Sequence, residues 1–220
     1  MSNKSLEATA YHEAGHVAAN LLLGIKVKTA TIKPGDGYLG RVEDATTAAA
    51  LKSINRVMDA VQNGDRAARR RARERAENAL MTLLAGNVAQ RFFSKKRIAK
   101  GAMSDWQKAL EYCEALSDGV EESSAYFAYM MARTRSLILR PMTWLQVEAI
   151  ASALLERETM TRAEVESVWE ETGRFILSPG ADQRLRKLQR ELGNYFRDHP
   201  LRHSEWKWAI GQTGDQGGEE

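Results

Sequence analysis

Apolar residues recur with helical spacing along much of the chain, beginning with residues 5–23. The positions of this first stripe are Leu6, Ala10, Ala14, Val17, Leu21 and Leu22. They repeat every three or four residues, which is the period of one buried helix face. Gly24 follows, at a position typical of a helix end. The pattern therefore predicts an amphipathic helix over residues 5–23.

The period changes to two directly after this helix. Within residues 25–33 the β-branched Val27, Thr29 and Thr31 alternate with other residues, and a Pro-Gly-Asp-Gly turn follows. Residues 38–42 are the expected returning strand. We predict a small two- or three-stranded sheet in which Val27, Thr29 and Thr31 form an edge strand that binds an extended substrate by backbone pairing. A hairpin that only covers the core is the alternative.

Helical periodicity dominates the rest of the chain. The expected helices cover residues 79–90, a segment starting at Ser104, residues 123–139, 141–157 and 161–172, and a segment containing Leu185, Leu188, Leu192 and Tyr195. Few prolines and many Ala, Arg, Glu and Leu residues agree with this pattern. We predict a mainly α fold with a small β-sheet, a domain over residues 1–175, and a C-terminal helical extension over 176–220 with a disordered tail at about 211–220.

Composition narrows the picture only slightly. The chain has 220 residues with 43% apolar content, enough for one good-sized core, and a net charge of +3. Its single cysteine, Cys113, excludes an internal disulfide and is expected to be a core thiol. No apolar run resembles a signal peptide or a membrane span. We therefore expect a cytoplasmic protein without membrane contact.

A basic run occupies residues 66–75, where six arginines are opposed by Glu74 alone. Runs of this kind usually form a solvated helix face or a loop. The alternative is a surface for an acidic partner or a nucleic acid. Because no aromatic residue within the run could stack on bases, we do not expect nucleic acid to be the partner.

The candidate chemistry lies in the first helix, as His12-Glu13-Ala14-Gly15-His16. Residues four apart share a helix face, so His12 and His16 can direct two imidazole nitrogens at one ion. Glu13 projects beside that ion, where a carboxylate can take a proton from water. Two histidines, a carboxylate base and a third ligand from elsewhere form a zinc hydrolase site. A chance match with packed histidines is the alternative.

Other sources of a third ligand fit less well. Leu22 stands where a metzincin would have its third histidine. Glu43 lies just past the expected strands rather than on a following helix, as a thermolysin-like ligand would. His199 and His203 repeat the four-residue spacing, but Pro200 between them interrupts a helix face. We expect these two histidines to be surface residues rather than a second metal site.

Several stretches, taken together in chain order, resemble the peptidase domain of FtsH-type ATP-dependent zinc proteases. They are the HExxH motif preceded by Tyr11, Leu84-Ala85-Gly86, Gly101-Ala102-x-Ser104-Asp105-x-Gln107-x-Ala109, and residues 150–160. The resemblance covers about residues 5–172. It implies one zinc ion bound by His12, His16 and Asp105, with Glu13 as the general base. It also implies a mainly helical domain with a short substrate-pairing strand.

The chain departs from that family in two ways. Asn87 and Gln90 replace an arginine and a glutamate, and Ser104, Trp106 and Leu110 also differ. These positions support the ligands, so orientation and rate are affected before metal binding is. The second departure is that no GxxxxGK[ST] phosphate loop and no membrane span is present, although the family fuses its peptidase domain to both.

These observations predict a zinc-dependent endopeptidase that cuts unfolded or flexible polypeptides without an ATPase of its own. A separate ATPase partner could supply unfolding. Members of the family assemble into six-membered rings, so a homo-oligomer is one further expectation from the resemblance. One alternative is a catalytically silent zinc-binding adaptor that docks on an ATPase, with which the altered Asn87 and Gln90 are compatible. The other is a basic nucleic-acid-associated helical protein.

Overall fold

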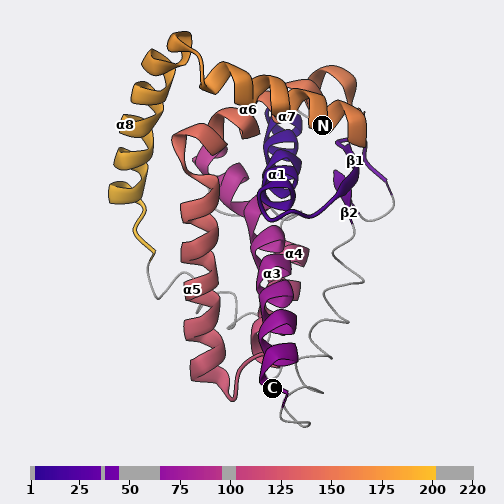
Figure 1. The fold of residues 1–220 in the computed structure, drawn as a ribbon, viewed down its shortest axis with the longest axis vertical. Helices are drawn as coiled ribbons and strands as arrows, with labels where there is room; N and C mark the ends of the chain where they lie inside the picture. The colour runs from indigo at the N-terminus through magenta and orange to yellow at the C-terminus, as the bar shows by residue number, and fades with distance from the viewer. Residues whose placement is uncertain (1–2, 36–37, 45–64, 96–102, 202–220) are drawn as a thin grey trace, which may run out of the picture.

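The protein is mainly helical, with one small sheet (Figure 1). A computed structural model describes residues 3–35, 38–44, 65–95 and 103–201. Its helices are α1 Asn3–Leu22, α3 Arg66–Ser94, α4 Met103–Ala115, α5 Val120–Ile138, α6 Pro141–Arg157, α7 Arg162–Ile176 and α8 Asp182–Asp198, with a 3₁₀ turn at Pro179–Ala181. The predicted mainly α fold is confirmed. Within the described segments, no helix combines the length and apolarity needed to cross a bilayer.

Helix α1 packs mainly on α3 and α6, and its apolar stripe is buried against them. The contact with α3 is close because small residues meet there. A Cβ atom added at Gly15 would lie 2.6 Å from the carbonyl oxygen of Ala85 and 2.8 Å from the Cβ of Ala89. The backbones can approach only because Gly15 has no side chain. This approach brings the HExxH turn of α1 against the middle of α3.

The sheet has three antiparallel strands in the order β2-β1-β3. They are β1 Val27–Thr31, β2 Arg41–Asp44 and β3 Thr159–Thr161. The second strand therefore begins three residues later than the predicted return at residue 38. The third strand comes from the segment between α6 and α7, far along the chain, which the sequence pattern had assigned only to a helix connection.

The predicted edge strand is wrong, because β1 is the central strand. Thr29 pairs with Glu43 of β2 on one side and with Thr161 of β3 on the other. The backbone of Thr29 and Thr31 is thus engaged on both sides by the sheet rather than open to an extended substrate, and Val27 pairs with Asp44 of β2. A local alternation shows that a strand exists, but it does not show how many distant partners will pair with it.

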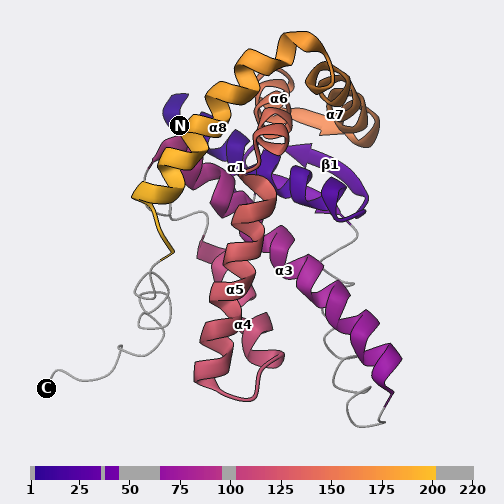
Figure 2. The same ribbon diagram turned by 60° about the vertical axis from the view of Figure 1, so that its left-hand side comes forward.

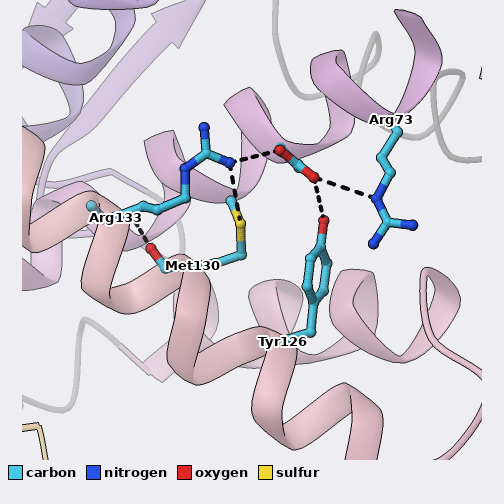
Figure 3. Close-up of polar contacts among 6 residues, drawn as sticks. Arg73, Tyr126, Met130 and Arg133 are labelled. Carbon is cyan, nitrogen blue, oxygen red and sulfur yellow. Dashed lines mark hydrogen bonds and ion pairs between the residues drawn. The ribbon is translucent and has the colours of Figure 1, made fainter. Parts of the chain in front are cut away.

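Helix α3 joins α5 through a polar cluster around Glu77 (Figure 3). The Glu77 carboxylate accepts hydrogen bonds from the Tyr126 hydroxyl at 2.9 Å and from Arg133 Nη1 at 2.7 Å. Arg73 Nε lies 3.4 Å from the same carboxylate. Phe127 and Met130 of α5 are buried in the core.

The basic run forms the first turns of α3, which diverge from α5 in Figure 2. The side chains of Arg66, Arg70, Arg71 and Arg75 are exposed. The expected solvated helix face is confirmed for these four residues.

The described part of the C-terminal extension packs against the body along α6. Leu188, Leu192 and Tyr195 of α8 are buried, which confirms the predicted apolar face. Arg184 Nη2 donates to both carboxylate oxygens of Glu148 on α6, each at 2.7 Å. The tail predicted to be disordered at 211–220 lies outside the described residues.

Candidate metal centre

Three side chains from two helices meet at one point. Helix α1 supplies His12 and His16, and the first turn of α4 supplies Asp105. Nε2 of His12 lies 3.1 Å from Asp105 Oδ2, and Nε2 of His16 lies 3.3 Å from the same oxygen. The two Nε2 atoms are 3.0 Å apart. The three side chains are 10, 12 and 18% exposed, so the cluster is nearly closed to solvent.

This spacing fits a tetrahedral metal ion. Ligand atoms about 2.0–2.1 Å from a tetrahedral zinc lie about 3.3–3.4 Å from one another. The three ligand atoms of the cluster form a triangle with sides of 3.0, 3.1 and 3.3 Å. Two imidazole nitrogens and one carboxylate oxygen are also common ligands of such an ion. The buried group can therefore hold a metal ion, with the fourth position left for another molecule.

A carbonyl oxygen on α3 fixes which nitrogen of His16 faces the centre. Nδ1 of His16 lies 2.8 Å from the carbonyl oxygen of Thr82. Since a carbonyl only accepts, Nδ1 must carry the hydrogen and donate it. In the neutral imidazole this leaves the lone pair on Nε2, directed at His12 and Asp105. This outer hydrogen bond selects the tautomer that a metal ligand needs.

Without an ion, the three groups share protons instead. Burial opposes a charge on Asp105, but hydrogen bonds from His12 and His16 outweigh it and hold the pKa of that carboxyl well below its ordinary value. Burial likewise opposes protonation of His16, yet its hydrogen bond to Asp105 and the Asp105 charge raise the pKa of His16 to about 9. The centre thus favours positive charge beside a carboxylate, and a divalent cation can take the place of the proton.

Glu13 lies beside the cluster without belonging to it. It is 4% exposed, and burial, more than the nearby Asp105 charge, raises the pKa of its carboxyl, while the two histidines oppose the rise. A Cβ atom added at Gly40 would lie 2.6 Å from Glu13 Oε1. The backbone just before β2 therefore passes close to this carboxylate. A buried carboxyl with a raised pKa beside a metal-binding group is suited to proton transfer.

Helix α3 leaves room for the imidazoles through one glycine. A Cβ atom added at Gly86 would lie 2.4 Å from Nε2 of His16 and 2.8 Å from Nε2 of His12. Any larger residue would therefore occupy the space of the ligand atoms. In the sequence, Gly86 stood out only as part of the family resemblance, and the structure shows that it faces the two imidazoles.

The structure brings His12, His16 and Asp105 together, although Asp105 had been implied only by the family resemblance. Glu43 stays out of the cluster and pairs with Arg41 at 3.5 Å on β2. His199 also lies apart, with Nδ1 3.2 Å from the carbonyl oxygen of Tyr195. Helix α4 begins at Met103, one residue before the predicted start. The role of the Thr82 carbonyl was missed, because a backbone atom leaves no signal in the sequence.

Two other residues with candidate roles lie in the core. Cys113 is fully buried, and burial raises the pKa of its thiol to about 12. The predicted core thiol is confirmed. Asn87, one of the departures from the family pattern, is buried next to Gly86 on α3.

Comparison with known proteins adds no assignment. No protein-family model matches the chain. A search of curated proteins likewise finds no match. The functional argument therefore depends on the geometry of the centre.

Proposed function

We propose that the protein is a zinc-dependent endopeptidase that hydrolyses peptide bonds of unfolded or flexible polypeptides. His12, His16 and Asp105 would hold the zinc ion, and Glu13 would be the general base. The observation that carries the proposal is the convergence of three ligand atoms within 3.3 Å of one another, with a buried carboxylate beside them. Zinc is proposed because two imidazoles and one carboxylate with an open fourth position form a common catalytic zinc site.

When bound, zinc would lower the pKa of a water molecule and polarise the carbonyl of the scissile peptide bond. Glu13 would take a proton from the water molecule that attacks the carbonyl carbon of the peptide bond. The raised pKa of Glu13 helps it keep the proton until it is delivered to the leaving nitrogen. The Thr82 carbonyl holds the His16 ring in the orientation the site needs, through the nitrogen that would not face the ion.

The outer edge of β2, on the side away from β1, is the proposed substrate-binding edge, in place of β1. In the order β2-β1-β3, β2 is a terminal strand of the described sheet. Gly40, directly before it, packs against Glu13. An extended polypeptide paired with this edge would lie beside the base. Backbone pairing needs an extended chain and tolerates many side chains, which favours unfolded or flexible substrates over folded ones.

The test is cleavage of unfolded casein by wild-type protein and Glu13→Gln, with the zinc content of both measured. We expect Glu13→Gln to bind zinc and keep its fold while losing most turnover, because the amide cannot accept the proton. Glu166→Gln is the matched control, since Glu166 pairs with Arg162 on α7 and its side chain is 43% exposed. Equal cleavage by wild type and Glu13→Gln would exclude the proposed role. Zinc binding without cleavage by wild type would favour the adaptor alternative.

A further inference from the structure

We propose that Asn20 is a positioning residue of the metal centre, which joins β2 to α3 and thereby fixes His16 as a ligand. The inference rests on the proposed function insofar as it needs a metal ion at His16. Asn20 lies on α1 four residues after His16, so both side chains lie on the same helix face. Asn20 is fully buried. A buried amide at this position needs polar partners.

The amide of Asn20 links three elements of the fold. Its Nδ2 donates to Asp44 Oδ2 at the end of β2, at 2.6 Å. Its Oδ1 accepts from the Thr82 hydroxyl on α3, at 3.2 Å. The orientation of the amide follows from the chemistry, because an ionised carboxylate only accepts and so must face the NH₂ group. The bond to Asp44 is charge-assisted, the stronger class of hydrogen bond.

Thr82 holds two residues of α1 with two different atoms. Its hydroxyl donates to Asn20, and its carbonyl oxygen accepts from Nδ1 of His16 at 2.8 Å. The hydroxyl contact therefore fixes the position of Thr82 along α1. If α3 shifted, the carbonyl would leave Nδ1 of His16, and Gly86, one turn further along α3, would no longer face the imidazoles. Asn20 thus acts on the ligand through Thr82.

The other half of the link reaches the strand beside the base. Asp44 ends β2, and Gly40 just before β2 packs against Glu13. Asn20 thus contacts both the strand that follows Gly40 and the helix that orients His16. Movement of β2 is then coupled to the orientation of the ligand. We therefore expect loss of the Asn20 amide to weaken metal binding as well as turnover.

The test measures metal affinity, which a merely structural amide would not change. The affinities for zinc and cobalt are determined by competition with a chelator, and folding is followed by circular dichroism. Asn20→Leu removes the contacts to Asp44 and Thr82 at nearly constant volume, and Thr82→Val removes the hydroxyl but keeps the carbonyl. Thr134→Val is the matched control, because the Thr134 hydroxyl is equally buried and donates to the Met130 carbonyl within α5, away from the centre.

We expect Asn20→Leu to bind metal about 10- to 100-fold more weakly than wild type, as is usual for loss of an outer support of a ligand. Thr82→Val should weaken binding in the same direction, and Thr134→Val should leave affinity unchanged. If Asn20→Leu fails to fold, Thr82→Val decides the question. If Asn20→Leu folds and binds metal as tightly as wild type, the inference is overturned. If it does not fold, wild-type metal affinity in Thr82→Val overturns it.

Failure of this inference and failure of the proposed function give different results. Wild type that binds metal but does not cleave casein removes the endopeptidase proposal, while weaker binding by Asn20→Leu would still support the positioning role. Wild type that binds and cleaves, with Asn20→Leu binding equally well, removes only the positioning role. Wild type that binds no metal removes both.

Discussion

At the scale of single residues, the candidate metal centre depends on two glycines as well as on the side chains that would bind the ion. Gly86 leaves space for both imidazoles, and Gly40 leaves space for the Glu13 carboxylate. Neither glycine takes part in chemistry. Each lets a backbone approach a functional side chain at a distance that a Cβ atom would prevent.

We predict that Gly86→Ala abolishes metal binding, because the new methyl carbon would lie 2.4 Å from Nε2 of His16. Gly193→Ala on α8 is the control, since a Cβ atom there meets nothing within 4 Å. Alanine in place of a helix-interior glycine should stabilise the fold by about 0.5–1 kcal/mol. Metal titration of both variants measures the loss of binding, and thermal melting of both measures the change in stability. Tight metal binding by Gly86→Ala would contradict the geometry of the centre.

His16 predicts how the metal-free protein responds to pH. Its pKa is raised from 6.5 to about 9 because its hydrogen bond to Asp105 outweighs burial. The folded state thus binds the proton more tightly than the unfolded state. The protonated His16 therefore stabilises the folded state, and this contribution is fully present below about pH 6.5. It should be lost as pH rises to about 9. Melting temperatures in the presence of a chelator should fall over this interval, and less so for His16→Asn. Equal slopes would contradict the assignment.

Cys113 should be chemically inert in the native protein. Its thiol is fully buried, and burial raises its pKa to about 12, so little thiolate exists near neutral pH. We expect no labelling by a thiol reagent such as iodoacetamide under native conditions and full labelling in denaturant. Mass spectrometry of both samples decides this, and rapid native labelling would show that α4 opens easily.

At the scale of elements, short polar contacts determine how the helices meet. A capping box begins α7: Glu164 N donates to the Thr161 hydroxyl, and the Glu164 carboxylate accepts from Thr161 N. Such contacts join neighbouring residues and can be read from the sequence. The Glu77 cluster instead joins α3 to α5 across residues far apart in the chain (Figure 3).

We predict that Tyr126→Phe lowers the free energy of unfolding by about 1–2 kcal/mol, because it removes a hydrogen bond to the Glu77 carboxylate. Tyr129→Phe is the matched control on the same helix, where the residue is 54% exposed. That change should be nearly neutral. Urea unfolding of both variants measures the difference. Equal losses of unfolding free energy in the two variants would show that the Tyr126–Glu77 hydrogen bond does not stabilise the packing of α3 on α5.

At the scale of the whole molecule, the predicted extension over residues 176–220 packs against the predicted 1–175 domain, as far as the structure describes it. Leu188 and Leu192 are buried against the body, and Arg184 binds Glu148 of α6. Tyr195 packs edge-on against Phe92 at the end of α3, with ring centroids 4.8 Å apart. These contacts indicate one cooperative unit through α8.

Leu188→Ala tests this unity. Leu188 is fully buried, so the alanine would leave a cavity and lower the free energy of unfolding by about 2–5 kcal/mol. If α8 belongs to the unit, the single melting transition of the whole chain should shift to lower temperature. Leu185→Ala, at a partly buried position on the same helix, should shift it less. A main transition that stays at the wild-type temperature, with a separate low-temperature step, would show that the extension unfolds alone.

The sequence by itself determined the features that depend on nearby residues: helix periodicity, the strand after α1, the cap of α7, and the pairing of His12 with His16 on one face. Asp105 required the resemblance, because no spacing rule links α4 to α1. Tertiary structure alone decided that β1 is central, that Thr82 orients His16, and that Gly86 leaves room for the ligands. Each of these depends on packing between segments distant in the chain, and a local pattern carries no information about such contacts.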